Sequence, residues 1–139
     1  MGKFVVISGL PASGKSTLIK ALKEKYNIVI VPEHNEWVNN KFPKKPENKE
    51  EKIEKQKFFL NIDVARYNWA KEHLNKADVV LSDTDFTSPL AHNYAESWQD
   101  GAFDIYAELV EEYASCLKSG KLGLADKYIY LESKVKKEV

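Results

Sequence analysis

The segment Gly9–Ser16 reads GLPASGKS and matches in full the pattern G-x-x-x-x-G-K-[ST] of the Walker A phosphate-binding loop. An apolar, β-branched stretch, Lys3–Ser8, comes directly before it, and an amphipathic stretch, Ser16–Tyr26, comes directly after it. A strand, a glycine-rich turn and a helix in this order aim backbone amides and the helix N-terminus at one anion. This context disfavours a tight glycine turn without a ligand, and it predicts a nucleotide-binding site.

The residue types within the loop suit the triphosphate of ATP together with Mg²⁺. The glycines allow backbone N–H groups to approach phosphate oxygens closely. Lys15 supplies a compact positive charge for the β- and γ-phosphates, and the Ser16 hydroxyl is a hard oxygen of the kind that Mg²⁺ prefers. The residues expected to bind the nucleotide are Gly9, Pro11, Ala12, Ser13, Gly14, Lys15, Ser16 and Thr17.

Strand-like and helical segments alternate along the rest of the chain, which predicts an α/β fold with a parallel sheet. Between the second strand and the long helix, Glu33–Asn40 is expected as a loop, and Ser88–Trp98 is expected as mixed structure. The expected strands are Lys3–Ser8, Asn27–Val31, Asp78–Ser82 and Lys127–Leu131. The expected helices are Ser16–Tyr26, about Glu47–Lys76, and a third with Phe103, Tyr106, Val110, Tyr113 and Leu117 on its apolar face, ended by Gly120.

Length and composition exclude several classes of protein. The 139 residues fit one domain, covering residues 1–139. Lys plus Arg and Asp plus Glu both number 21, so no net charge attracts a nucleic acid polymer or a membrane surface. No apolar run is long enough to span a bilayer. The chain has one cysteine, Cys116, which excludes an intramolecular disulfide and fits a reducing cytoplasm.

Carboxylates follow two of the expected strands at the point where each strand ends. In an open parallel sheet, ligands bind outside the carboxyl ends of the strands. Asp83 ends the apolar run Val79–Ser82 in the Walker B pattern, whose carboxylate holds Mg²⁺ or its water shell, so Ser16 and Asp83 are the expected metal ligands. Glu33 is a candidate general base for a substrate hydroxyl, or a ligand of it. The alternatives are a capping role for Asp83 and an exposed loop position for Glu33.

Two further side chains are candidates for substrate binding. Trp37 can stack on a planar substrate, and Arg66, the one arginine of the chain, can form a two-pronged contact with a phosphate. The alternatives are a lid over the core for Trp37 and a surface ion pair for Arg66. We expect His34 and His92 to be surface or hydrogen-bonded histidines rather than ligands.

The segment Asn75–Asp78 spells N-K-x-D, the guanine-reading motif of GTPases. In that class the motif follows a buried strand, whereas here it ends a helical segment. No D-x-x-G motif follows the third strand either, because Phe86 takes the place of the glycine. We therefore interpret Asn75–Asp78 as a helix terminus.

Taken together, these residues resemble the thymidylate kinase and deoxynucleoside kinase branch of the P-loop kinases. Asp83–Asn93 is similar to the thymidylate kinase pattern D-R-Y-x-x-S-x-x-A-Y-Q, and Phe58–Arg66 is similar to the L-F-x-A-D-R helix of that family. Pro32 and Glu33, followed by Trp37, are similar to the E-P-x-x-x-W segment of deoxynucleoside kinases. The segment that leads from Gly120 into the last expected strand is also similar to the corresponding segment of these kinases.

This resemblance implies a three-layer α/β sandwich with a parallel sheet in the order 2-3-1-4. It implies that Glu33 lies near the acceptor hydroxyl or phosphate, Trp37 and Phe59 near the base, and Asp83 near Mg²⁺. With Lys15 stabilising charge, the catalytic residues are then expected to be Lys15, Glu33 and Asp83, and the substrate-binding residues Glu33, Trp37, Phe59 and Arg66.

Two departures from the family pattern bear on activity. The family has an arginine where this chain has Thr84, directly after the strand-three aspartate. The sequence given ends at Val139, where the family's lid helix, with its arginines, is expected to begin. Phosphoryl transfer depends on positioning and on charge neutralisation, so these departures leave open a shortened kinase, or one that uses lysines such as Lys44 and Lys45.

The sequence thus supports one leading hypothesis and two alternatives. The leading hypothesis is an ATP- and Mg²⁺-dependent phosphotransferase that acts on a nucleoside or a nucleoside monophosphate. The first alternative is a nucleotide-binding protein without kinase activity, acting as a sensor or subunit. The second is a kinase for another small molecule. In each case the expected partner is a small molecule rather than a nucleic acid or a membrane, and a homodimer is left open.

Overall fold

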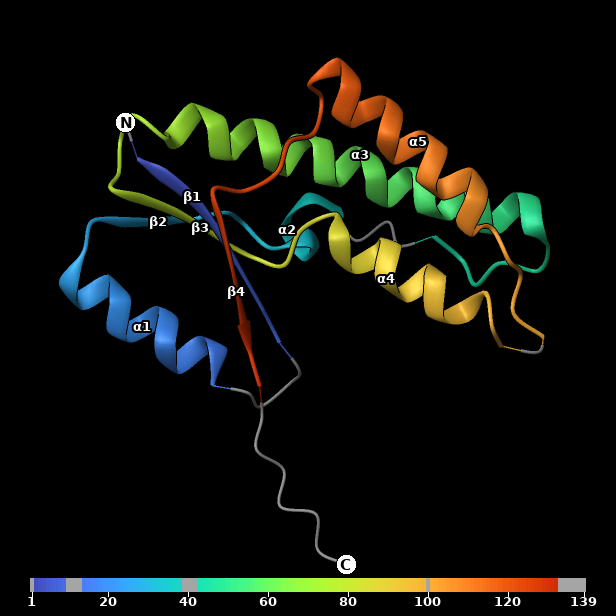
Figure 1. The fold of residues 1–139 in the computed structure, drawn as a ribbon, viewed down its shortest axis with the longest axis horizontal. Coiled ribbons are helices and arrows are strands. Elements are labelled where there is room, and N and C mark those ends of the chain that lie inside the picture. The colour runs from blue at the N-terminus through green and yellow to red at the C-terminus, as the bar shows by residue number, and fades with distance from the viewer. Residues whose placement is uncertain (1, 10–13, 39–42, 100, 133–139) are drawn as a thin grey trace, which may run out of the picture. The chain divides into compact units, whose positions relative to one another are not determined.

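The computed structural model describes residues 2–9, 14–38, 43–99 and 101–132 of the chain. Within these ranges the chain forms four strands and five helices (Figure 1). In chain order they are β1 (Lys3–Gly9), α1 (Lys15–Lys25), β2 (Ile28–Ile30), α2 (His34–Val38), α3 (Lys49–His73), β3 (Val79–Asp83), α4 (Thr87–Glu96), α5 (Tyr106–Ser119) and β4 (Lys127–Leu131).

The contacts divide the chain into two compact units, which are each described by themselves. The sheet unit comprises Met1–Val31, Ala70–Thr84 and Ala125–Val139, and it holds all four strands and α1. The helical unit comprises Pro32–Trp69 and Asp85–Leu124, and it holds α2, α4, α5 and most of α3. The expectation of a single domain over residues 1–139 stays a prediction.

All four strands of the sheet unit run parallel, in the order β2-β3-β1-β4. This confirms the predicted α/β fold, the parallel sheet and the strand order. The central strands β1 and β3 carry β-branched and aliphatic side chains on both faces, as strands of a covered parallel sheet do. Val6, Ile7, Val80 and Leu81 are almost completely buried. Helix α1 lies beside β1 (Figure 1).

The carboxyl edge of the sheet brings the ends of β1 and β3 together. Ile7 of β1 is in register with Asp83 of β3, and Gly9 is in register with Leu131 of β4. The N–H of Thr84 extends the ladder beyond β3 by donating to the Ile7 carbonyl at 2.8 Å. The chain therefore leaves β1 for the phosphate loop directly beside the end of β3, as the position of Asp83 in the sequence predicts.

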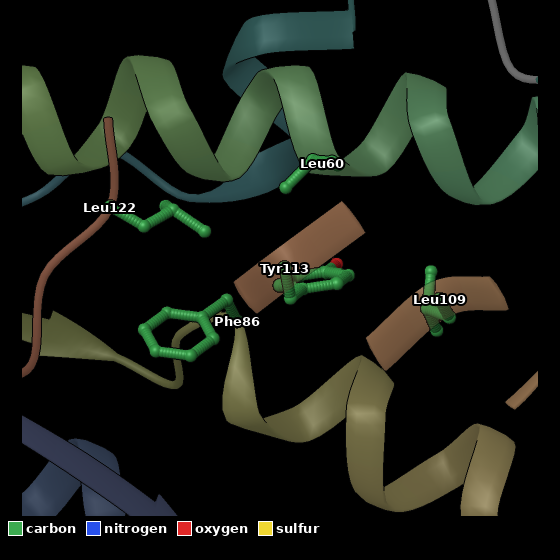
Figure 2. Packing of buried hydrophobic residues seen from close by; sticks show 5 residues of the cluster. All are labelled: Leu60, Phe86, Leu109, Tyr113 and Leu122. Carbon is green, nitrogen blue, oxygen red and sulfur yellow. The ribbon is translucent and has the colours of Figure 1, made fainter. Parts of the chain in front are cut away.

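The helical unit has a hydrophobic core of its own, shown in Figure 2. The side chains converge from α3, from the start of α4, from α5 and from the segment after it, and the rings of Phe86 and Tyr113 stack with centroids 5.9 Å apart. Cys116 packs against this core, as a small apolar residue does. The buried members of the cluster are Leu60, Phe86, Leu109, Tyr113 and Leu122.

The apolar face predicted for α5 is partly wrong. Tyr113 is buried as expected, but Val110 and Leu117 are exposed, and Leu109 is buried instead. The buried positions Ile105, Leu109 and Tyr113 follow each other at intervals of four residues, and they define a face rotated from the predicted one. Gly120 ends the helix as predicted, with a φ of 80° in the left-handed region where glycine is favoured.

Two helices and one apolar stripe depart from the predictions. The segment expected as a loop contains the five-residue α2, and the segment expected as mixed structure contains α4. Pro89 lies in the first turn of α4, where the missing N–H costs nothing. The amphipathic stretch Ser16–Tyr26 predicted an apolar side for α1, whereas α1 has no fully buried residue and Tyr26, just after it, is exposed.

A buried lysine ties three segments of the helical unit together. Lys52 of α3 binds the carboxylate of Glu96 at the end of α4, and it also donates to the main-chain carbonyl of Phe103 ahead of α5. The Lys52 side chain is 8% exposed and the Glu96 side chain 23%. Removing one partner of a buried pair leaves the other charge uncompensated, so this contact matters more than surface pairs do.

Replacement of Glu96 tests this tie. We expect Glu96→Gln to destabilise the protein by about 2 kcal/mol at neutral pH, since a hydrogen bond to a buried charge is lost. The hydrogen bond from Lys52 lowers the pKa of Glu96 below its ordinary value of 4.5. A lowered pKa stabilises the folded state above the ordinary pKa, so the difference between variant and wild type should shrink as the pH falls below 4.5. Urea unfolding at several pH values measures it.

The exposed pair of Lys49 with Glu108, 2.9 Å apart, is the matched control. Its side chains are 49% and 44% exposed, so Glu108→Gln should leave the urea midpoint unchanged. An equal effect of the two substitutions would contradict a special role for the Lys52 contact.

Candidate functional site

The phosphate-loop motif ends at the first turn of α1. Gly14 precedes this helix with φ 92° and ψ 11°, a left-handed conformation that glycine adopts without strain. Lys15 is the first helical residue, and the first turn contains no acidic residue. The first amides of a helix have no partner within it and carry partial positive charge, so this end of α1 favours an anion.

Lys15 reaches the carboxylate at the end of β3. Its ammonium nitrogen lies 2.8 Å from Oδ1 of Asp83, and the two side chains are 20% and 30% exposed. The predicted phosphate-binding cation and the predicted Walker B carboxylate are therefore in direct contact. Because both groups are partly open to water, either can exchange this contact for a ligand.

The donor groups around this pair fit Mg²⁺. Ser16 and Thr17 follow Lys15 on α1 and are exposed, so the Ser16 hydroxyl is accessible, and Asp83 supplies a carboxylate. Hard oxygen ligands of this kind suit Mg²⁺, which takes few ligands from the protein and the rest from phosphate and water. The described part of the chain has no group of three or more His, Cys, Asp or Glu side chains that could hold a metal ion.

The carboxylate that caps the following helix is Asp85. Its Oδ1 accepts hydrogen bonds from the N–H of Thr87 at 2.9 Å and from the Thr87 hydroxyl at 2.6 Å. Capping of this kind satisfies amides at the start of α4. The capping role considered for Asp83 thus falls to Asp85, while Asp83 faces Lys15.

Within the helical unit, two predicted substrate-binding residues meet at one carbonyl. The indole nitrogen of Trp37 donates to the Pro32 carbonyl at 3.1 Å, and Nε of Arg66 donates to the same oxygen at 3.0 Å. Arg66 is 4% exposed, so the alternative of a surface ion pair is wrong. Glu33, the next residue after Pro32, is exposed.

Asp63 is a buried carboxylate beside these residues, and sequence analysis missed it. It is 3% exposed; its Oδ1 lies 2.9 Å from Nε2 of His34, and its Oδ2 lies 3.4 Å from the Tyr113 hydroxyl. Burial raises the pKa of Tyr113 above its usual value, and the Asp63 charge acts in the same direction, so this hydroxyl stays protonated and donates. His34 is hydrogen-bonded, as expected.

Helical spacing was the signal that could have revealed Asp63. Phe59, Asp63 and Arg66 stand at positions i, i+4 and i+7, which share one face of a helix. The ring of Phe59 packs edge to face against Phe58, with centroids 5.5 Å apart. The buried acid Asp63 and the buried base Arg66 thus share a helix face with Phe59, which was predicted to lie near the nucleobase. Helical periodicity can reveal such a polar cluster from the sequence.

The remaining predicted residues divide by position. Gly9 ends β1, Gly14 precedes α1, and Thr17 lies on α1. The predicted nucleotide-binding residues Pro11, Ala12 and Ser13 lie outside the described residues.

The N-K-x-D segment lies at the opposite edge of the sheet. The N–H of Lys76 donates to the His73 carbonyl at 3.0 Å, which forms a turn at the end of α3. The N–H of Asp78 donates to the Asn27 carbonyl at 3.0 Å, ahead of both β2 and β3. The segment therefore borders the amino ends of the strands, away from Asp83, and the interpretation as a helix terminus is confirmed.

Comparison with known families agrees with this geometry. A family model described as an AAA domain matches residues 4–120, which is most of the chain. The chain belongs to this family of P-loop NTPase-like domains. No curated protein and no solved structure matches the chain significantly.

The family match supports a general class for this site and not a particular activity. As a member of the AAA domain family, the protein is a P-loop nucleotide-binding protein, in agreement with the loop and with Lys15 beside Asp83. The match supports the P-loop class, and it does not extend to the thymidylate kinase and deoxynucleoside kinase branch. Separately, no helix among the described residues combines the length and apolar composition that crossing a membrane requires.

A double-mutant cycle tests the contact between His34 and Asp63. We expect Asp63→Asn and His34→Gln each to destabilise the protein, with a coupling energy of about 1–2 kcal/mol, because the two residues share a hydrogen bond to a buried carboxylate. Tyr113→Phe is the control, since it removes only the longer contact at 3.4 Å. Urea midpoints at constant slope supply the energies. Strict additivity of the two single variants would refute the interaction.

Proposed function

We propose that the protein transfers the γ-phosphoryl group of ATP, with Mg²⁺, to a nucleoside or a nucleoside monophosphate. The observation that carries this proposal is the 2.8 Å contact between Lys15 and Asp83, at the point where the phosphate-loop motif adjoins the end of β3. A cation for the phosphates and a carboxylate for the metal are the two charged groups that phosphoryl transfer requires from a P-loop protein.

The roles of the residues follow from their chemistry. Lys15 exchanges Asp83 for the β- and γ-phosphates and neutralises charge that develops during transfer. The Ser16 hydroxyl and the Asp83 carboxylate are the groups that would hold Mg²⁺, which neutralises phosphate charge when bound. The first amides of α1 orient the anion, since they point along the helix axis toward it.

The acceptor side of the proposal rests on the helical unit. Glu33 is exposed and follows β2 by three residues in the chain, so its carboxylate is available to accept a proton from a hydroxyl. Trp37 and Arg66 are both held by the Pro32 carbonyl, which fixes an aromatic side chain and a guanidinium close to Glu33 in the fold of that unit. An aromatic ring and an arginine suit a base and a phosphate, respectively.

One alternative is supported by a specific observation. Thr84 occupies the position of the arginine that the resembled kinases carry, and the family match is to an AAA domain rather than to a kinase. A nucleotide-binding sensor or subunit without transferase activity fits both facts. The proposal retains a small-molecule acceptor, no nucleic acid or membrane partner, a cytoplasmic location and an oligomeric state that includes a homodimer as an option.

Nucleotide binding is tested through Lys15. We expect Lys15→Ala to weaken binding of ATP about 100-fold, because a charge-assisted contact with phosphate is lost. Lys20→Ala is the matched control, since Lys20 is an exposed lysine on the same helix and should be silent. Isothermal titration calorimetry measures both. Binding of wild-type strength by the Lys15 variant would remove the basis of the site assignment.

Transfer is tested by coupled detection of ADP release with a panel of nucleosides, nucleoside monophosphates and other small hydroxyl compounds. The proposal predicts that a nucleoside or nucleoside monophosphate stimulates ADP release, and that Glu33→Gln lowers this stimulated rate by a factor of about 10²–10⁴. ATP binding without any stimulated release would favour the sensor, and stimulation by a compound outside the nucleosides would favour the other kinase.

The exchange of Lys15 between Asp83 and phosphate has its own signature. Without Mg²⁺, Asp83→Asn should tighten ATP binding a few-fold, because the competing carboxylate charge is gone; with Mg²⁺, it should weaken binding about tenfold. Calorimetry in EDTA and in MgCl₂ gives the two values. A change of the same sign in both buffers would argue against a shared role of Asp83.

A further inference from the structure

We propose that Ser82 and Thr84 form a lock around Asp83, which holds its carboxylate toward Lys15 and makes Ser82 a positioning residue for the metal and nucleotide. This inference rests on the proposed function for its nucleotide-affinity readout, and on the geometry of the sheet unit for its structural basis. Neither residue belongs to the phosphate-loop motif, and neither was singled out as a ligand.

Ser82 is a polar residue in an apolar environment. It is 2% exposed, it follows the buried Val80 and Leu81 on β3, and it is in register with the buried Val6 of β1. A hydroxyl at such a position is costly unless it forms a hydrogen bond. Its Oγ donates to the main-chain carbonyl of Thr84 at 2.7 Å, so the hydroxyl bridges across Asp83 to the residue after it.

Thr84 has a strained backbone. Its φ of 61° is in the left-handed region, and among the described residues it is the one non-glycine residue with a positive φ. For a β-branched side chain this conformation is energetically unfavourable, and it persists only where the surroundings impose it. Two hydrogen bonds do so here: the Thr84 N–H donates to the Ile7 carbonyl, and its carbonyl accepts from Ser82.

The two bonds fix the residue between them. Successive side chains of a strand point to opposite faces of the sheet. The buried Ser82 hydroxyl and the Asp83 carboxylate therefore point to opposite faces. The bond to Ile7 holds the Asp83–Thr84 peptide group against β1, and the bond from Ser82 holds the next peptide group, which carries the Thr84 carbonyl. The Asp83 carboxylate, which lies 2.8 Å from Lys15, is thus carried by a backbone that these two hydrogen bonds restrain.

Strain at this position is consistent with a functional role. Glycine or asparagine would adopt the same turn at lower cost, because both tolerate the left-handed region. A threonine that is forced into this turn leaves less backbone freedom than a glycine would. The structure therefore combines a strained residue, Thr84, with a buried hydroxyl, that of Ser82, on either side of the carboxylate that contacts Lys15.

The experiment compares the affinity for a non-hydrolysable ATP analogue in MgCl₂ and in EDTA. Ser82→Ala should reduce the enhancement of affinity by Mg²⁺ roughly tenfold, with little change in EDTA, because Lys15 and the loop are intact. Ser82→Thr keeps the hydroxyl and should restore the enhancement. Thr84→Gly should also reduce it, whereas Thr84→Asn should preserve it and raise the melting temperature.

Ser119→Ala is the matched control, since the Ser119 hydroxyl also binds a main-chain carbonyl, that of Cys116 at 3.2 Å, but in the helical unit. An unchanged Mg²⁺ enhancement in Ser82→Ala, equal to that of Ser119→Ala, would overturn the lock and leave the proposed function standing. A loss in Ser82→Ala that Ser82→Thr does not restore would also overturn it, because a packing defect would then explain the loss.

A crystal structure of Ser82→Ala separates the lock from the proposed function. The lock predicts that the φ of Thr84 leaves the left-handed region and that the distance between Lys15 and Asp83 lengthens. If wild type binds no triphosphate, the proposed function fails, and this structure still decides the lock: both features unchanged would overturn it. The variant's melting temperature confirms that the protein used is folded.

Discussion

The contact between Lys15 and Asp83 is the interaction on which the candidate site depends. It exists because β1 and β3 are neighbours with Ile7 in register with Asp83, and Lys15, the first residue of α1, reaches the end of β3. A parallel sheet places the carboxyl ends of its strands at one edge, and helix α1 begins there with uncompensated amides. The strand order, the register and the start of α1 together place the Lys15 ammonium and the Asp83 carboxylate side by side, where a phosphate and its metal ion can bind.

The helical unit solves a different problem, which is how to bury charged groups. Asp63 and Lys52 are both nearly inaccessible, and each has more than one hydrogen-bonding partner. Such networks are stable only when their members are satisfied, so they fix the relative positions of the segments that contribute them. The helices that carry Trp37 and Arg66 are held by polar contacts as well as by the core around Tyr113.

Much of the sheet unit could be predicted from the sequence, because its signals are local. The β-branched runs predicted the four strands, the family resemblance implied their order, and the loop motif with Asp83 predicted the charged pair. The helical unit was harder to predict. The face of α5 was misplaced because Val110 and Leu109 are both apolar, and only packing decides which is buried. Helical spacing could have pointed to Asp63, but its partners His34 and Tyr113 come from other elements, and the turn at Thr84 also depends on tertiary hydrogen bonds, which no local pattern encodes.

The Pro32 carbonyl accepts hydrogen bonds from both Trp37 and Arg66, and a carbonyl has two lone pairs. If one donor is removed, the other still forms a hydrogen bond to the oxygen, so each side chain compensates for the loss of the other. Mutational scanning of single positions would then underestimate how firmly this corner of the helical unit is built. Its contribution to stability becomes visible only when both donors are removed together.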